Sequence, residues 1–133
     1  MMHAQRGTAM VEFAISSLVL LMLLLGILEL GRALYTYHTI ADAARLGARW
    51  AIVRGSGCID ASCPATQSSV KSYVLAHVPL LDPSSVTVTA NWPSGEAAGD
   101  PVSVTVKYNF NFAVPYIGNS LTMQSTSQMV ISE

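Results

Sequence analysis

Residues that could perform chemistry are few in this sequence, and two cysteines are the first of them. Cys58 and Cys63 bracket the four residues "IDAS", whereas His3, His38 and His77 are scattered along the chain. A structural zinc site needs four ligands at suitable spacing, and the cysteines do not form a C-x2-C pair. We therefore expect no metal site and favour a disulfide between Cys58 and Cys63, which indicates an oxidising compartment. Closing so short a loop contributes about 2 kcal/mol in the chain-entropy model.

No group of residues predicts catalysis or nucleic-acid binding. His77 is a candidate base, but no nucleophile or acid motif accompanies it, so a partly buried helix residue is the simpler interpretation. The chain offers no Ser/His/Asp set, no paired catalytic carboxylates and no phosphate loop. Seven Lys and Arg stand against eight Asp and Glu, without a basic cluster that would bind phosphates. We expect no enzyme activity, no catalytic residue, no cofactor and no nucleic-acid partner.

A single carboxylate, Glu12, lies at the edge of a long apolar run. Residues 13–28 carry no charge, and only two serines and a glycine interrupt them. A charged residue costs about 2.5–3.5 kcal/mol at the centre of a membrane helix, so such a residue is expected to have a partner. The alternative is that Glu12 lies at the headgroup boundary and is simply hydrated.

The apolar run predicts a membrane-spanning helix over about residues 12–34. Its uncharged part rises about 24 Å, slightly less than the roughly 30 Å of a hydrocarbon core. The span lengthens if Glu29 and Arg32, three residues apart, pair or snorkel. A cleaved secretory signal is the alternative, because "MMHAQR" is a basic leader ahead of an apolar block. The small-x-small site at residues 41–43 lies too far downstream to favour it.

The helical pattern continues beyond the span and predicts one N-terminal helix over residues 8–54. No proline occurs in residues 34–54, and "RGSGC" follows, with glycines suited to a helix C-terminus. Ala43, Gly47 and Ala51 recur at intervals of four. Such spacing allows close contact with another helix, or it allows the helix to dock on the chain's own globular part. The two interpretations have equal weight here.

Residues 55–133 predict a small disulfide-bearing head of the α+β class. A second helix ending at Pro79 is expected, and the period then changes to two, which predicts strands over residues 86–92, 102–112 and 121–131. We expect a three- to four-stranded antiparallel sheet with one helix packed on its apolar face. The expected helix face comprises Val70, Tyr73, Val74, His77 and Val78, and the third strand should point Leu121, Met123, Met129 and Ile131 to one side.

The segment Arg6-Gly7-Thr8-Ala9-Met10-Val11-Glu12-Phe13 resembles the processing site of type IV prepilins. The resemblance implies that residues 1–7 are a leader, that a prepilin peptidase cuts after Gly7, and that Thr8 becomes the first residue. A glycine there suits an extended, accessible backbone. The resemblance also implies an assembly salt bridge, in which Glu12 of one subunit faces the new amine of Thr8 on its neighbour. The opposite charge offsets desolvation of the carboxylate.

Three stretches, "RGTAMVEFA", "ELGRALY" and "DAARLGAR", narrow the resemblance to the pilin-like TadE-like pseudopilins of the tight-adherence (Tad or Flp) pilus. The motif positions are Phe13, Glu29, Gly31 and Arg32. Many members carry a proline in the apolar helix, but this chain reads "AISSLVLL" there, so no kink is expected.

The resemblance implies a minor pilin that acts in pilus initiation or assembly, or as a tip or shaft component for surface adherence. Its implied partners are other pilin subunits, which bind through the N-terminal helix, the prepilin peptidase, the inner-membrane assembly platform and the lipid bilayer. The precursor is expected in the bacterial inner membrane with its head in the periplasm, and the assembled protein at the cell surface.

The distribution of arginines conflicts with this orientation. Arg32, Arg45, Arg49 and Arg54 follow the span, and the positive-inside rule would keep such a head in the cytoplasm. The disulfide and the prepilin resemblance both place the head outside. A separate alternative is a signal-anchored extracytoplasmic binding or sensor domain, which would not be incorporated in a filament and predicts no proteolytic maturation.

Overall fold

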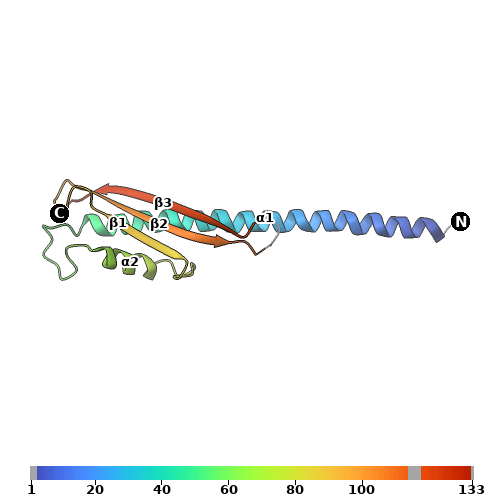
Figure 1. The fold of residues 1–133 in the computed structure, drawn as a ribbon, viewed down its shortest axis with the longest axis horizontal. Coiled ribbons are helices and arrows are strands. Elements are labelled where there is room, and N and C mark those ends of the chain that lie inside the picture. Colours follow the sequence, from blue (N-terminus) through green and yellow to red (C-terminus); the bar gives the residue numbers. More distant parts are fainter. Residues whose placement is uncertain (1–2, 114–117, 133) are drawn as a thin grey trace.

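The computed structural model describes residues 3–113 and 118–132, with side chains from residue 7 onward. A long helix, α1 (His3–Ile52), is followed by a short helix, α2 (Gln67–Ala76), and by three strands. The strands are β1 (Val86–Asn91), β2 (Pro101–Asn111) and β3 (Ser120–Val130). The head lies alongside the second half of α1, and the first half projects away from it (Figure 1). The expected α+β class is confirmed, with a long apolar N-terminal helix and a small head.

The sheet is antiparallel in the order β1-β2-β3. β2 is therefore the central strand, and β1 and β3 are edge strands that form the two margins of the sheet. Its inner face is apolar because every second residue of β2 points inward, and Val102, Val104 and Val106 are fully buried. On the outer face the hydroxyls of Thr105 and Thr126 lie 2.8 Å apart across the ladder. The period-two pattern thus predicted the strands and their faces.

One residue on the inner side of the third strand is more exposed than the others. Met123 and Ile131 are buried and Met129 is partly buried, but Leu121 is 45% exposed. Leu121 is the second residue of an edge strand, so it has a neighbouring strand on one side only, where it pairs with Phe110. Fewer neighbours therefore cover it than cover residues of the central strand.

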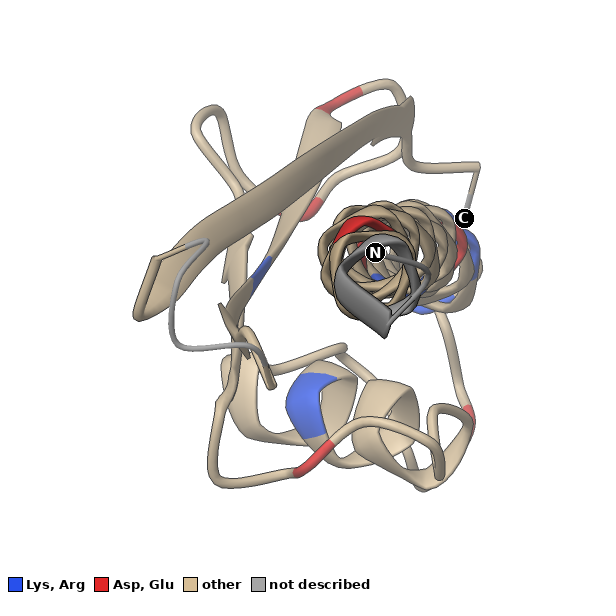
Figure 2. Cartoon of the chain, turned by 90° about the vertical axis from the view of Figure 1, so that its right-hand side faces the viewer, with Lys and Arg blue, Asp and Glu red and all other residues tan. Residues whose placement is uncertain are grey.

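Two helices, rather than the expected one, cover the inner face of the sheet. The second half of α1 packs on β2 and β3, while α2 packs on β1 and on α1. Viewed along α1, the sheet passes one side of the helix and α2 lies on another (Figure 2). The core residues that line this junction include Ile40, Val70 and Val74, all 0% exposed.

The stripe of small residues on α1 docks the head. Ala43, Ala48 and Ala51 are buried, and Gly47 lies directly against the facing valines. A Cβ atom at Gly47 would lie 2.8 Å from Cγ2 of Val74. Of the two interpretations of this stripe, the structure supports docking on the chain's own globular part.

The helix α2 begins at a capping box and ends earlier than its apolar pattern predicts. The Thr66 hydroxyl accepts from the backbone N–H of Ser69, whose own hydroxyl accepts from the Thr66 N–H. The helix stops at Ala76, so His77 is the C-cap and Val78 lies beyond the helix, which corrects the expected face. Pro79 gives the reason, because a residue before proline disfavours helical dihedrals.

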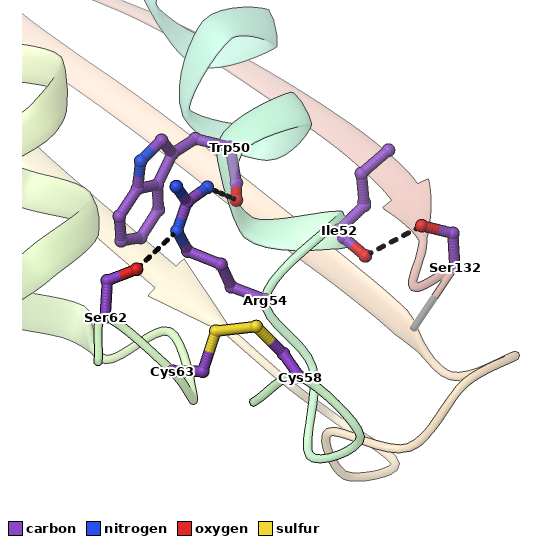
Figure 3. Close-up of a disulfide and its surroundings, with 7 residues drawn as sticks. All are labelled: Trp50, Ile52, Arg54, Cys58, Ser62, Cys63 and Ser132. Atoms are coloured by element: carbon purple, nitrogen blue, oxygen red, sulfur yellow. Dashed lines mark hydrogen bonds between the residues drawn. A yellow bond between two sulfur atoms is a disulfide. The ribbon is translucent and has the colours of Figure 1, made fainter. Parts of the chain in front are cut away.

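The segment after α1 holds the disulfide at the end of the molecule opposite the N-terminus (Figures 1 and 3). Cys58 and Cys63 are bonded, with their Cα atoms 5.8 Å apart, and the Cys63–Pro64 peptide is cis. The chain end returns to the same region, where the N–H of Ser132 donates to the carbonyl of Ile52 at 2.9 Å (Figure 3). The expected disulfide is confirmed.

A turn stabilised by Asp82 leads into β1. The hydroxyl and the backbone N–H of Ser84 donate to Oδ1 of Asp82 at 2.8 and 2.9 Å. These bonds favour the ionised carboxylate, and they hold the pKa of Asp82 below its ordinary value.

Candidate functional site

The first half of α1 is a bare apolar rod. Between residues 7 and 28 every residue is exposed except Ser17 and Gly26, which are both half-buried. An 18-residue window within Gly7–Ile52 has a mean hydropathy of 2.5, and none of it is buried in the molecule. The helix is therefore long and apolar enough to cross a membrane. Exposed hydrophobic surface of this extent is rare in soluble monomers, so this half needs lipid or other helices around it.

The structure brings the expected cleavage and salt-bridge residues onto one side of this rod. Gly7, Thr8 and Glu12 border the same shallow hollow on α1, together with Val11 and Ile15. Thr8 and Glu12 are one turn apart, so their side chains share a face. Glu12 is exposed and has no ion-pair partner among the side chains that the structure describes.

The structure shows the backbone at Gly7 in the single chain, where no peptidase is bound. Gly7 lies inside α1 and is helical, rather than extended. The surrounding residues "AQRGTAMVEF" contain no proline and several good helix formers, which propagate the helix through one glycine at a cost of about 1 kcal/mol. No heavy atom outside the helix backbone lies within 4 Å of a Cβ built on Gly7, so the residue is sterically accessible.

Glu29 marks the point at which the bare half of α1 ends. Its side chain is 7% exposed and accepts two hydrogen bonds from Nη1 of Arg32, at 2.9 and 3.1 Å. The backbone N–H of Ala113, just after β2, donates to Oε1 of Glu29 at 3.3 Å. Of the two alternatives for Glu29 and Arg32, pairing or snorkelling, the structure shows the pair, and Glu29 also binds the helix to the end of β2.

Arg32 adds two further contacts to this junction. Its guanidinium carbon lies 4.9 Å from the ring centroid of Phe110, and Nη2 lies 3.5 Å from the carbonyl oxygen of Asn111. Sequence reasoning predicted the pair but missed its contacts with β2. The alternation "NFNFA" at the end of that strand was the available signal, because a strand end with exposed carbonyls and aromatic rings suits an arginine.

The remaining motif residues have no contact role within this chain. Phe13 is 74% exposed, and a Cβ added at Gly31 would meet nothing within 4 Å. Both therefore lie on surface that is open to lipid or to another subunit. Of the four motif positions, Glu29 and Arg32 bond the end of β2.

The segment after α1 is held by an arginine that the sequence did not single out. Arg54 donates from Nε to the Ser62 hydroxyl at 3.0 Å and from Nη1 to the Trp50 carbonyl at 3.2 Å (Figure 3). Its guanidinium carbon lies 4.2 Å from the centroid of the Trp50 ring, which stacks on Tyr73 of α2. These contacts attach the disulfide loop to both helices.

A groove of about 560 Å³ lies between α1 and the segment after α2, and its residues do not form a catalytic set. His38, Asp42, Arg45, Arg49 and His77 contribute its polar groups. Nδ1 of His77 donates to the carbonyl of Tyr73 at 2.8 Å, which fixes the ring as a helix-capping group. Within the described residues no group of three or more His, Cys, Asp or Glu side chains could hold a metal ion.

A family model described as TadE-like protein matches residues 7–49. No curated protein and no solved structure matches the chain. The matched segment contains all four motif positions and both residues of the expected assembly salt bridge. The resemblance inferred from the sequence is therefore confirmed for residues 7–49.

Proposed function

We propose that this chain, with its TadE-like N-terminal segment, is a minor pilin or pseudopilin of a Tad-type type IV pilus. A prepilin peptidase matures it after Gly7, and the bare half of α1 carries it from the inner membrane into the pilus. The observation that carries the proposal is the match over residues 7–49 on a helix whose first half is wholly uncovered. Such a half is suited first to lipid and then to a bundle of similar helices.

The size of the head supports a minor role, because the major subunits of this pilus resemble little more than the helix. The head contains a disulfide and a packed core, so it presents a stable surface outside the membrane. It acts in pilus initiation, in assembly, or as a tip or shaft component at the cell surface. The head is periplasmic before assembly, because a disulfide is maintained in that oxidising compartment.

Glu12 has a defined role in this proposal. Cleavage after Gly7 creates a positively charged amine on Thr8, and the carboxylate of a neighbouring subunit's Glu12 pairs with it in the helix bundle. An unpaired carboxylate in a low-dielectric bundle would oppose assembly or take up a proton. Exposure of Glu12 in the single chain leaves it available for this pairing.

N-terminal sequencing and intact mass test the maturation step. The chain is isolated from cells with and without the prepilin peptidase, and the mature form is expected to begin at Thr8 only when the peptidase is present. Replacing Gly7 with Ala or a bulkier residue should impair cleavage. A chain that keeps residues 1–7 in peptidase-competent cells contradicts the proposal.

The role of Glu12 is tested by its incorporation into pili. Glu12→Ala should be cleaved normally and yet reach sheared pili at a level lowered about tenfold or more, because an inserted subunit lacks the carboxylate for its neighbour's amine. Ser16→Ala, one turn further along the same exposed surface, is the matched control. Equal incorporation of the Glu12→Ala and Ser16→Ala chains would show that the carboxylate has no role in assembly.

A further inference from the structure

The two margins of the sheet differ in how their outward backbone groups are satisfied. At the β1 margin, the side-chain amide of Gln67 donates to the carbonyl of Val88 at 2.7 Å and accepts from the N–H of Ala90. One glutamine of α2 thus bonds β1 as a neighbouring strand would. This margin is covered in part, because Gln67 satisfies two of its outward groups and α2 lies beside it (Figure 1).

The alternation of a strand's backbone groups identifies the outward groups of β3. The backbone groups of Val88 and Ala90 point outward from β1, so the odd-numbered residues of β1 bond β2. Because these pair with odd-numbered residues of β2, such as Thr89 with Thr105, the even-numbered residues of β2 bond β3. The register pairs these with odd-numbered residues of β3, such as Val106 with Ser125. The outward N–H and C=O groups of β3 therefore belong to Thr122, Gln124, Thr126 and Gln128, and to the residues at the strand's two ends.

These outward groups have no partner among the described residues. Within β3 the described hydrogen bonds of the backbone go to β2, and no side chain bonds its margin in the way that Gln67 bonds β1. Natural sheets protect a long margin with charged residues, proline, bulges or a covering segment. The sequence of β3, "SLTMQSTSQMV", contains no charged residue and no proline, and its register with β2 is unbroken over all 11 residues.

We propose that the β3 margin is a docking site for an extended, uncharged segment of a different pilus subunit, which pairs with β3 as an antiparallel fourth strand. An extended polypeptide is the occupant because it supplies donors and acceptors at the spacing of the unpaired groups. An uncharged segment fits because β3 offers no charge with which to pair. Antiparallel pairing continues the pattern of this sheet, in which both ladders are antiparallel, and it is slightly more stable per residue than parallel pairing.

A second copy of this chain cannot provide that strand in the same membrane. β3 runs in the same direction as α1, away from the projecting half (Figure 1). An antiparallel partner must run towards the membrane, and of the described strands only β2 does so. β2 is already paired on both sides. This step rests on the proposed membrane anchoring, whereas the unpaired margin itself does not.

Residue-resolved amide hydrogen exchange on the full chain in detergent tests the margin without reference to pilus function. The N–H groups of Thr122, Gln124, Thr126 and Gln128 should exchange much faster than those of Met123, Ser125 and Ser127. Uniform protection along β3 would show that the margin is already closed and would overturn the proposal.

Cross-linking in piliated cells tests the occupant. A photoreactive benzophenone amino acid replaces Gln128, and the adduct is mapped by mass spectrometry. An uncharged extended segment of another pilus subunit supports the proposal, whereas a second copy of this chain, or no adduct, overturns it. Gln124→Pro removes an outward N–H and should lower the adduct about tenfold, while Gln124→Ala keeps that N–H and should retain the adduct. Equal adduct from these two variants also overturns the proposal.

The fluorescence of Trp50 and Trp92 reports whether the Gln124→Pro head remains folded. If that variant unfolds, Thr126→Lys takes its place in the experiment, and Thr126→Ser is the control. A lysine on an edge strand disfavours pairing with a further strand and leaves the β2–β3 ladder intact. Thr126→Lys should lose the adduct and Thr126→Ser should keep it. If the chain is not cleaved before Thr8 but the amide exchange along β3 alternates as expected, the result counts against the proposed function. It does not count against the open margin of β3.

Discussion

The two halves of α1 form one continuous helix but meet different surroundings. The first half is bare and carries large apolar side chains, whereas the second half is covered by the head and is lined by alanines and one glycine. Composition follows surroundings, because small residues allow the backbone of the second half to approach the head closely, whereas the large apolar side chains of the first half suit contact with lipid. Glu29 lies at the boundary. The difference shows that a single helix can combine an anchor and a core element.

The largest expected effect comes from truncating the same residue type in the two halves. Ile40 is fully buried, so Ile40→Ala should lower the free energy of unfolding of the head by about 2–5 kcal/mol. Ile27 is 66% exposed in the bare half, and Ile27→Ala should leave head stability within about 0.5 kcal/mol. Denaturant unfolding in detergent, followed by fluorescence of Trp50 and Trp92, measures both. Equal losses would mean that the two halves are not distinct environments.

A smaller effect is expected from adding one methyl group to each half. At Gly47 a Cβ would lie 2.8 Å from Val74 and 3.0 Å from Val104, whereas at Gly26 it would meet nothing within 4 Å. Overpacking costs about 1–3 kcal/mol, which outweighs a helix-propensity gain of about 1 kcal/mol. Gly47→Ala should therefore destabilise the head, and Gly26→Ala should not. The same unfolding assay decides between this outcome and a gain at both positions.

The boundary between the halves provides the third prediction, which concerns the two members of one ion pair. Arg32→Ala leaves the buried Glu29 carboxylate with the 3.3 Å hydrogen bond from the Ala113 N–H as its remaining described partner. Glu29→Ala leaves an arginine whose side chain is 53% exposed and can be hydrated. Removing the partner of a buried charge is the more costly change. Arg32→Ala should therefore lower head stability by about 1–3 kcal/mol, and Glu29→Ala by less.

The exposed pair of Asp42 and Arg45 supplies the control for that prediction and the smallest effect. Its side chains are 77% and 63% exposed, so Asp42→Ala should change stability by less than about 0.5 kcal/mol. A loss from Asp42→Ala as large as that from Arg32→Ala would show that burial does not determine the value of these pairs.

The sequence predicted the elements whose periodicity is uninterrupted, and it missed contacts between distant segments. The alternation in β2 and the apolar run of α1 were sufficient for their assignment, because burial on one face imposes a period on the residues. The contact of Gln67 with the β1 margin and that of Glu29 with Ala113 left no such pattern. Each depends on a tertiary arrangement that places one polar side chain beside a particular backbone group.

The candidate site was predicted in part for the same reason. The spacing of Gly7, Thr8 and Glu12 is local and is legible in the sequence, so their shared face on α1 followed from helix geometry. The helical backbone at Gly7 was not predicted, because a glycine permits both an extended and a helical backbone and its neighbours decide the outcome. Exposure of Phe13 and Gly31 required knowledge of where the head ends.

The direction of the strands has a mechanical consequence. The strands of the head run alongside α1 rather than across it (Figure 1), and Ser132 bonds the carbonyl of Ile52 (Figure 3). A pull along α1 would then act along the ladders, so that many hydrogen bonds would resist sliding together instead of opening one after another. A head built in this way is suited to withstand tension between a tethered base and a distal attachment.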